Sequence, residues 1–491
     1  MASQPNHPLI VALDIGTSST RALLYDAHGS LVQGREVKIP YEQHLTPDGG
    51  VECEADVLLK STLRAVSRLM KLCSATDCSR VVAVATSCFW HALVGVDAGG
   101  EAVTPIYSWA DTRSRSEIPA LQSRLPATDY HARTGAFIHS AFWPAKISWL
   151  RHTRPDLADR VKTWLSFPDF MAMRLAGDAS TSISLASATG LMNEETADWD
   201  DTTLGALSID RSNLPQIAPP GHTICLQDAG RLAGMPDVPW YLAYGDGACS
   251  NIGAGGVSDR RIVINVSTSG AIRALCPKPA KPVAEGLFRY RMDERRWVIG
   301  GAMSNGGNVY AWLERTLRLP DSELLNRKLA ASEPDGHGLT VLPFWAGERS
   351  PGWHADASAT ISGLNLSTTA ANIAQASMES IAFTFRTQRA DLLKAFPEAT
   401  DLIVSGGAVE HSRYMTKLLA NVMGAPVRVS LDPEPSGRGA ALAVLEQLGI
   451  LKDISASPDR LSKPVHPEPD AVRLYDKAFD RFQVLYDKLI A

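Results

Sequence analysis

Residues 11–29 read VALDIGTSSTRALLYDAHG, and in this segment a run of apolar residues is closed by Asp14 and Ile15. A turn of Gly16, Thr17, Ser18 and Ser19 follows directly, and a second strand-like run comes after it. Turns rich in glycine, serine and threonine expose backbone N–H groups and hydroxyls, which are the donors that bind phosphate. The same residue types also build ordinary hairpin turns. The segment alone is equally consistent with a phosphate-binding turn and a plain hairpin.

A related segment lies at residues 262–275, IVINVSTSGAIRAL, about half of the 491-residue chain further on. The alignment pairs these residues: Asp14 with Asn265, Thr17 with Thr268, Ser18 with Ser269 and, after one inserted residue, Arg21 with Arg273. Similarity at half the chain length predicts two domains of related fold, each with one hydroxyl-lined turn. Two such turns facing each other across a cleft could hold the two ends of a polyphosphate. Only the first copy has the carboxylate, as expected if one metal-organising group suffices.

The composition is that of a globular protein, with 45% hydrophobic and 21% charged residues. Its net charge of −5 argues against a nucleic-acid partner. Seven cysteines without a C-x-x-C pair indicate reduced thiols rather than a disulfide framework or a zinc site. The N-terminal segment lacks a basic region before its apolar run, and the most apolar window, residues 81–96, is too short to span a bilayer. We therefore expect a cytoplasmic protein with no membrane partner.

Apolar periodicity predicts an α/β protein in which strands and helices alternate. The expected strands are residues 9–15, 21–26, 31–39, 81–86, 340–342 and 402–405, and the expected helices are 56–72, 308–317, 371–396, 411–423 and 437–448. The glycine-dense stretch 245–258 predicts a domain boundary, and the Pro/Ser-rich stretch 455–469 predicts a linker. We expect domains at 1–250 and 251–452, then a linker and terminal helix at 453–491.

The terminal helix has an apolar stripe at helical spacing. Its members are Tyr475, Phe479, Phe482, Tyr486 and Leu489. We expect this stripe to pack against the body of the protein, with a homodimer contact as the alternative.

Several common catalytic motifs are absent from the sequence. No G-x-x-x-x-G-K-[ST] occurs, so the chain is not a P-loop enzyme, and no G-x-G-x-x-G follows a strand. G-x-S-x-G and H-E-x-x-H are also missing. The paired hydroxyl turns remain as the candidate phosphate-binding elements.

Two segments resemble the signatures of the FGGY carbohydrate kinases, a family of the actin/Hsp70/hexokinase fold class. Residues 359–379 read ATISGLNLSTTAANIAQASME and fit the second signature throughout, while residues 144–150, PAKISWL, keep the core of the first. In the first signature the proline is one residue nearer to Lys146 than the family pattern has it. The resemblance extends over roughly residues 9–449. It implies two actin-like (ribonuclease H-like) domains with mixed sheets flanked by helices, with ATP and sugar in the interdomain cleft.

The resemblance implies that Asp246, in the segment AYGDGA, is the catalytic base. Phosphoryl transfer needs positioning, charge neutralisation and a group that orients the attacking hydroxyl. Asp14 fits a carboxylate that holds Mg²⁺ through water, and Asp246 lies near the same metal in the family. The alternative for Asp246 is a turn aspartate beside glycines.

The nucleotide is expected between the hydroxyl turns and the glycines of LIVSGGAVEHSRYM, residues 402–415, where bare backbone lets a phosphate approach a helix N-terminus. The helix that begins near Glu434 resembles the one that closes over the adenine, or it is a small-residue helix that packs tightly. The expected nucleotide-binding residues are Asp14, Gly16, Thr17, Ser18, Ser19, Arg21, Thr268, Ser269, Gly270, Asn305, Gly306, Gly406, Gly407, Glu434 and Arg438.

Three segments, WADTR, TGAFIH and ASATG, look like the gluconokinase branch of the family, and so does Gly247 after Asp246. Xylulokinases have Asp-Asn at that position and glycerol kinases Asp-Gln. The expected substrate residues are Trp90, His91, Asp111, Arg113, His139 and Asp246. Arg113 and His139 fit a substrate carboxylate. The alternatives are that Trp90 belongs to the core, that a lone histidine is only a satisfied hydrogen-bonding group, and that Arg113 pairs with Asp111.

Three positions near the expected sugar depart from the pattern. Ser267 stands where the family often has glycine, Trp90 replaces a common methionine, and TSISL lacks the usual Asp-Tyr before ASATG.

The resemblance implies ATP-dependent transfer of the γ-phosphoryl group to a primary hydroxyl of an open-chain sugar acid, with D-gluconate giving 6-phosphogluconate. The alternatives are a xylulokinase-like kinase of a ketose or polyol and, more remotely, an actin/Hsp70-like nucleotide switch or a sugar sensor.

Overall fold

The computed structural model describes residues 7–227, 232, 234–279, 283–410 and 412–490. The chain forms two compact units, which are described separately. The first comprises Met1–Gly253, Arg289–Val298 and Asp432–Pro458, and the second comprises Ala254–Phe288, Ile299–Leu431 and Asp459–Ala491. Within the described part of the chain, no helix combines the length and apolar character that crossing a bilayer requires.

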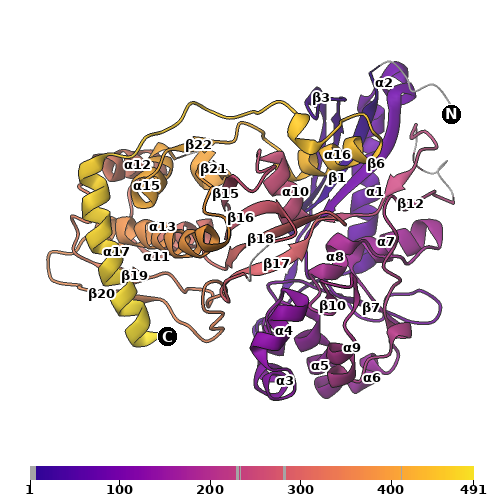
Figure 1. Cartoon of the computed structure of the whole chain (residues 1–491), viewed down its shortest axis with the longest axis horizontal. Helices are drawn as coiled ribbons and strands as arrows, with labels where there is room; N and C mark the ends of the chain where they lie inside the picture. Colours follow the sequence, from indigo (N-terminus) through magenta and orange to yellow (C-terminus); the bar gives the residue numbers. More distant parts are fainter. Residues whose placement is uncertain (1–6, 228–231, 233, 280–282, 411, 491) are drawn as a thin grey trace. The chain divides into compact units, whose positions relative to one another are not determined.

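The first unit is built on a seven-stranded sheet with the order β12-β13-β6-β1-β2-β3 and β14 as a further partner of β6 (Figure 1). β1 (Leu9–Ile15) pairs antiparallel with β2 (Ser19–Tyr25) and parallel with β6 (Val81–Cys88). Alternate residues of β1 point to opposite faces of the sheet. Leu9, Val11 and Leu13 pack with α1 (Ala55–Leu72), so Asp14 points to the other face, which α16 (Pro435–Gln447) covers.

The remaining elements of the first unit surround this sheet. The strands are β3 (Leu31–Pro40), β4 (His44–Leu45), β5 (Val51–Cys53), β7 (Val94–Val96), β8 (Ile106–Tyr107), β9 (Thr163–Leu165), β10 (Met192–Asn193), β11 (Asp198–Trp199), β12 (Thr223–Ile224), β13 (Trp240–Tyr241) and β14 (Tyr244–Gly245). The helices are α2 (Ala75–Arg80), α3 (Ile118–Arg124), α4 (Ala127–Thr134), α5 (Trp143–Thr153), α6 (Pro155–Ala158), α7 (Phe167–Ala176), α8 (Ile183–Ser187), α9 (Asp201–Leu207) and α10 (Asp246–Gly253).

A second sheet has six strands in the order β17-β18-β16-β15-β21-β22, and all of them lie in the second unit except for the Arg289–Val298 part of β17 and β18, which is assigned to the first. Its strands are β15 (Arg261–Val266), β16 (Gly270–Pro277), β17 (Phe288–Arg291), β18 (Arg296–Met303), β21 (Asp401–Ser405) and β22 (Val427–Val429). β15 pairs antiparallel with β16 and parallel with β21, as β1 pairs with β2 and β6. The two sheets therefore repeat one strand order, which confirms the predicted α/β class with two related halves.

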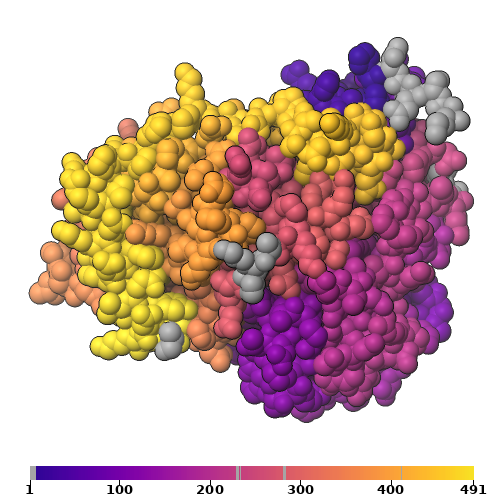
Figure 2. Space-filling view, in the orientation of Figure 1, coloured from indigo at the N-terminus to yellow at the C-terminus, as the bar shows by residue number. Residues whose placement is uncertain are grey.

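The second unit also contains the small sheet β19 (Thr340–Leu342) and β20 (Thr360–Ser362) and six helices among its described residues. These helices are α11 (Gly307–Thr316), α12 (Ser322–Ala331), α13 (Ala370–Ala395), α14 (Gly407–Glu410), α15 (Arg413–Met423) and α17 (Pro469–Leu489). α17 lies on the surface of the second unit, yellow in Figure 2. Its Tyr475 and Phe482 are buried against Phe383 of α13, so the aromatic stripe packs on the body of the protein.

Each compact unit is made of three separate segments of the chain, whereas the predicted domains 1–250, 251–452 and 453–491 are continuous. The segment that contains α16 was expected in the second domain, but it clusters with the first unit. The cause is packing: a Cβ on Gly439 would lie 1.9 Å from the Cys249 carbonyl oxygen of α10. The two helices approach that closely because α16 is rich in small residues. The consecutive limits themselves stay a prediction.

The predicted alignment of Arg21 with Arg273 is corrected by strand register. Asp14 lies opposite Arg21 on β2, but Asn265 lies opposite Ala271 on β16. Arg273 is opposite Val263, two positions further along. The second turn is one residue shorter than the first, not longer, so Arg21 has no charged counterpart in the second sheet.

Candidate functional site

A carboxylate lies at the carboxyl end of β1. Asp14 is only 4% exposed and accepts hydrogen bonds from Arg21 Nη1 at 2.9 Å and Ser87 Oγ at 3.3 Å. Burial raises the pKa of Asp14, and the Arg21 charge acts against that rise. Arg21 thus keeps a negative charge stable at a position that is poorly solvated.

Arg21 contacts a second carboxylate. Its Nε lies 3.2 Å from Glu434 Oε1 at the start of α16. Burial raises the pKa of Glu434 to about 7. Asp14, Arg21 and Glu434 therefore form one carboxylate–guanidinium–carboxylate cluster in the first unit.

The backbone carbonyls of the turn between β1 and β2 accept hydrogen bonds from neighbouring groups of the protein. Gly16 N–H donates to Ser19 O at 3.0 Å, and Tyr41 donates from its hydroxyl to Gly16 O at 2.5 Å and from its N–H to Ser18 O at 3.1 Å. Thr17 is half-buried and Ser18 is exposed, whereas Ser19 is 1% exposed. The turn can therefore present Thr17 and Ser18 to a ligand, but Ser19 faces the interior.

Asp246 begins α10 immediately after β14. Tyr244 and Gly245 of β14 lie opposite Ser87 and Cys88 of β6, and Asp14 lies opposite the same Ser87 from β1. The three strands are parallel, so Asp14 and Asp246 meet at one sheet edge on either side of β6. Burial and both carboxylates raise the pKa of the Cys88 thiol well above its ordinary value. Two carboxylates at one edge can bind a hard cation and accept a proton.

Trp90 lies against the start of this acidic edge. Its Nε1 donates to Ser184 O at 3.1 Å, and Gly245 N–H donates to Ser184 Oγ at 3.1 Å. A Cβ on Gly245 would lie 1.6 Å from Trp90 Nε1, so only glycine fits beside the indole. Trp90 is 6% exposed, and its indole packs against Gly245, the residue before Asp246.

His91 has a left-handed backbone conformation, with φ of 67°. Its Nδ1 lies 2.6 Å from Ala188 O of the ASATG segment, so Nδ1 carries the proton and donates. Its ring packs edge-on against Phe142 at 4.7 Å and Tyr290 at 5.7 Å. The predicted sugar-side segments around Trp90, His91 and ASATG therefore converge within the first unit.

His139 is 8% exposed and precedes α5. Its Nδ1 accepts the N–H of Ala141 at 3.1 Å, so a neutral ring carries its proton on Nε2. The two predicted histidines thus have opposite tautomers, each imposed by a backbone group.

Arg113 and Asp111 differ from their predicted role at the sugar. Arg113 Nη2 contacts Asp111 at 2.6 Å and Glu52 at 2.6 Å, and its guanidinium lies over Tyr107 at 5.3 Å and Trp149 at 4.8 Å. Asp111 is 2% exposed. This is the alternative in which Arg113 pairs with Asp111: both groups are used inside the protein, because a desolvated charge is stable only with partners.

The second unit contains a pocket of about 910 Å³. Its lining residues are Val266, Ser267, Thr268, Gly306, Gly307, Asn308, Tyr310, Ala311, Trp312, Arg315, Ser322, Asn326, Leu329, Trp345, Ala346, Met378, Gly407, Ala408, Ser412 and Tyr414. Trp312 and Trp345 lie 5.4 Å apart between ring centroids. The pocket therefore joins an aromatic, apolar part to a polar part formed by the second hydroxyl turn. Such a pocket suits a flat ring linked to a charged group.

The second hydroxyl turn is held by the start of α11. Ser267 O accepts the N–H of Gly307 at 2.6 Å, and Thr268 O accepts that of Asn308 at 3.0 Å. The carbonyls thus face the helix, and the exposed Thr268 side chain lines the pocket. A Cβ on Gly306 would lie 2.5 Å from Ser269 O, so glycine permits this close approach.

Asn305, Gly406 and Gly407, which were also predicted to bind the nucleotide, lie in or beside this pocket. Asn305 donates to Gly347 O and accepts from Ala346 N–H, both at 2.9 Å, which fixes the loop carrying Trp345. Gly406 has φ of 96°, and a Cβ there would lie 2.5 Å from Val266 O. Gly407 has open space around its Cα and lines the pocket.

Arg438 differs from its predicted place at the adenine. It is 3% exposed and donates to the carbonyls of Gly29 and Gly253 at 3.1 and 2.8 Å, and to Pro458 O at 2.8 Å. All these partners belong to the first unit. Arg438 therefore holds α16 in place, as the tight-packing alternative for that helix predicts. Sequence reasoning missed Trp312 and Trp345, because no motif marks them.

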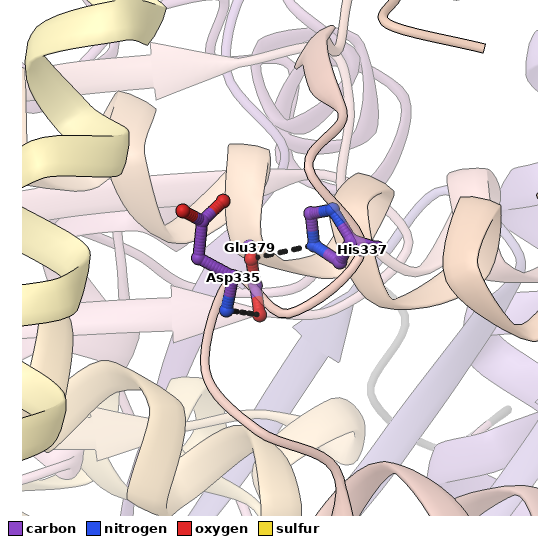
Figure 3. A group of neighbouring side chains, drawn as sticks. All are labelled: Asp335, His337 and Glu379. Atoms are coloured by element: carbon purple, nitrogen blue, oxygen red, sulfur yellow. Dashed lines mark hydrogen bonds and ion pairs between the residues drawn. The ribbon is translucent and has the colours of Figure 1, made fainter. Parts of the chain in front are cut away.

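A further cluster in the second unit contains Asp335, His337 and Glu379 (Figure 3). His337 Nε2 donates to Glu379 Oε2 at 2.9 Å. Further groups extend the network: Leu339 N–H donates to His337 Nδ1, Arg481 to Asp335, and Gln375 Nε2, Asp335 N–H and the Tyr475 hydroxyl to Glu379. Because the imidazole nitrogens and the carboxylates are used in these contacts, the cluster links α13 to α17 structurally.

The comparisons with known proteins agree with this architecture. Residues 9–253 match the N-terminal domain of the FGGY family of carbohydrate kinases, and residues 264–445 match its C-terminal domain. The gluconokinase of Bacillus subtilis is 26% identical over 94% of this chain and 91% of its own length.

Two solved structures from Lactobacillus acidophilus, a gluconate kinase and a ligand-bound xylulose kinase, each have a TM-score of 0.90 and 26% identity over 99% of both chains. The described edge carboxylates and the second-unit pocket thus lie in a fold shared with sugar kinases. The chain belongs to the FGGY family of carbohydrate kinases.

Proposed function

We propose that this carbohydrate kinase transfers the γ-phosphoryl group of ATP to the primary hydroxyl of D-gluconate. The observation that carries the proposal is that the ASATG segment contacts the sugar-side residues of the first unit: the His91 ring bonds to Ala188 O, and Ser184, just before this segment, bonds to Gly245, the neighbour of Asp246. Gluconokinase similarity over nearly the whole chain supports it. Gly247 is buried and small, which leaves room where a larger residue would contact the sugar.

Asp246 acts as the general base. The substrate hydroxyl gives its proton to the Asp246 carboxylate as its oxygen forms a bond to the γ-phosphorus, and the bond from that phosphorus to the ADP oxygen breaks. Removing water from the site when the substrates are bound limits wasteful ATP hydrolysis.

Asp14 and Asp246 fit Mg²⁺ by the chemistry of their donor set, because hard carboxylate oxygens at one sheet edge are typical magnesium ligands. Bound Mg²⁺ neutralises charge on the phosphates. Arg21, already paired with Asp14, opposes the rise in the pKa of that carboxyl group that burial causes.

The nucleotide lies in the second-unit pocket. The adenine packs against Trp312 and Trp345, where an aromatic wall suits a flat base. Its phosphates reach Thr268 and Gly407, which supply a hydroxyl and unobstructed backbone. Thr17 and Ser18 of the first turn are further hydroxyl groups of the kind that bind phosphate.

In this proposal His139, and not Arg113, binds the gluconate carboxylate, because Arg113 is paired with Asp111 and Glu52. The Nε2 proton of His139 can donate to a carboxylate oxygen. A ketose kinase is the second candidate, since the xylulose kinase from Lactobacillus acidophilus is structurally as similar as the gluconate kinase.

The deciding experiment is coupled ADP release with Mg·ATP against D-gluconate, D-xylulose, D-ribulose, L-ribulose, glycerol and erythritol. A response dominated by gluconate supports the proposal. A response dominated by a ketose or neutral polyol keeps the kinase and rejects gluconate as substrate. ADP release without any sugar, measured in parallel, gives the background hydrolysis.

A further inference from the structure

A buried lysine of α5 lies directly behind the sugar-side residues. Lys146 is 1% exposed, and its Nζ donates to Ala141 O at 2.6 Å and to His91 O at 3.0 Å. Both acceptors are backbone carbonyls rather than carboxylates. The amine therefore joins two loops that are 50 residues apart in the sequence.

The two acceptor residues, Ala141 and His91, each also take part in a contact that orients a histidine ring. Ala141 accepts from Lys146 through its carbonyl, and its own N–H donates to His139 Nδ1 at 3.1 Å. His91 accepts from Lys146 through its carbonyl, and its ring is turned toward Ala188 O. One amine thus contacts the backbone of His91 itself and the backbone of Ala141, the residue whose N–H orients the His139 ring.

The His91 backbone needs such support. A non-glycine residue at φ of 67° is strained by roughly 1–2 kcal/mol, and it keeps this conformation only where its surroundings impose it. The Lys146 contact acts on the carbonyl of this strained residue, and the Ala188 contact acts on its ring.

We propose that Lys146 is a positioning residue that sets the affinity for the sugar by holding His91 and His139 in place. The inference rests on the proposed placement of the sugar beside these histidines, but not on gluconate being the substrate. Burial lowers the pKa of Lys146 to about 7. The Asp111 charge acts against this fall, and the Nζ donates one hydrogen bond to each of the two carbonyl acceptors.

Lys146→Met tests the proposal, because methionine keeps much of the apolar volume and removes the donors. We expect the KM for the sugar to rise tenfold to a hundredfold, on the order typical of a substrate group misplaced by about 1 Å. The KM for ATP should stay within about twofold, because the nucleotide pocket lies in the other unit. The sugar used is whichever one the wild-type enzyme phosphorylates best, so a failed gluconate assay leaves this test intact.

Trp199→Phe is the matched control. Trp199 is buried in the same unit and also donates from its side chain to a backbone carbonyl, that of Pro215 at 2.9 Å, but it touches neither histidine. Trp199→Phe should lower the melting temperature, and any change in the KM for the sugar should be matched by a similar change in the KM for ATP. An unchanged sugar KM in Lys146→Met, or parallel changes in both KM values like those of the control, would overturn the proposal.

Lys146→Gln keeps the test decisive where the methionine variant does not fold. Its amide retains two N–H donors on a shorter side chain. We expect a sugar KM between those of the wild type and a donor-free variant, with the ATP KM unchanged. A sugar KM and an ATP KM that rise together in Lys146→Gln, with a lowered melting temperature, would make Lys146 a purely structural residue and contradict the proposal.

Discussion

The turn after β1 and the turn after β15 occupy equivalent places in two sheets of one strand order, but their electrostatics differ. At the end of β1, Asp14 is held by Ser87 and Arg21. At the end of β15, Asn265 donates to Ser405 Oγ at 3.0 Å instead. The serine partner on the neighbouring parallel strand is retained, and only the charge is lost.

The difference indicates a division of labour between the two halves. The position of the turn comes from the repeated strand order, so both halves can present hydroxyls and backbone to phosphate. The charged cluster of Asp14, Arg21 and Glu434 is confined to the unit that also carries Asp246. We infer that the first unit performs the chemistry and the second holds the nucleotide.

Asp246→Asn should have the largest effect. An amide cannot accept the hydroxyl proton, so we expect kcat to fall by about 10²–10⁴ while ATP and sugar still bind. Steady-state turnover and calorimetric titration measure the two properties. Turnover close to wild type would remove Asp246 as the base.

Asp14→Asn makes the first turn resemble the second. We expect a loss of about a hundredfold in kcat and a higher Mg²⁺ requirement, because a preorganised charge near the phosphates is removed. The matched variant is Asn265→Ala, which removes no charge and should cost less than tenfold. Equal losses in the two variants would contradict the division of labour.

Arg113 forms a second carboxylate–guanidinium–carboxylate cluster in the first unit, with Asp111 and Glu52. Because its side chain is only 12% exposed, Arg113→Ala leaves two poorly solvated carboxylates and should cost about 3 kcal/mol of unfolding free energy. Activity on acidic and neutral sugars should fall in the same proportion. A loss selective for an acidic sugar would return Arg113 to the substrate site.

Thr268→Val tests the turn after β15, which has Asn265 where the first turn has Asp14. Losing one hydroxyl donor to a phosphate should raise the KM for ATP about tenfold and leave the order of sugar preference unchanged. Initial rates with varied ATP and with a panel of sugars provide the check. An altered sugar preference would contradict the assignment of this turn to the nucleotide.

The smallest effect concerns pH. Burial raises the pKa of Glu434 from its ordinary value of 4.5 to about 7, so the folded state holds this proton more tightly than the unfolded state. The stabilisation is complete below pH 4.5 and is lost as the pH rises to about 7. Since a quarter of the side chain is exposed, we expect a change of only about 1 kcal/mol.

Urea unfolding at pH 5 and pH 8 measures this change, and Glu434→Gln should abolish it. The same pH dependence in wild type and variant would show that Glu434 does not contribute to it.

Several local features were predictable because they depend on neighbours in the sequence. β1 and β19 have the predicted limits, and α1 and α13 each begin one residue earlier than expected. Apolar periodicity and turn residues act over a few positions, so one sequence contains them fully. The hydroxyl turns were predicted for the same reason, from short motifs and an internal repeat, whereas Asp246 was proposed from the family resemblance, and its role stays a prediction.

The sequence by itself determined the α/β class, the two related halves and, through its signature segments, the carbohydrate kinase family. Only the tertiary structure decided that Arg113 forms ion pairs with Asp111 and Glu52. It also decided that α16 packs in the first unit and that Trp312 and Trp345 line one pocket. The physical reason is that a charge or a ring acquires its role from partners distant in the sequence. Burial and pairing, which decide whether a group is free to bind a ligand, exist only after the chain has folded.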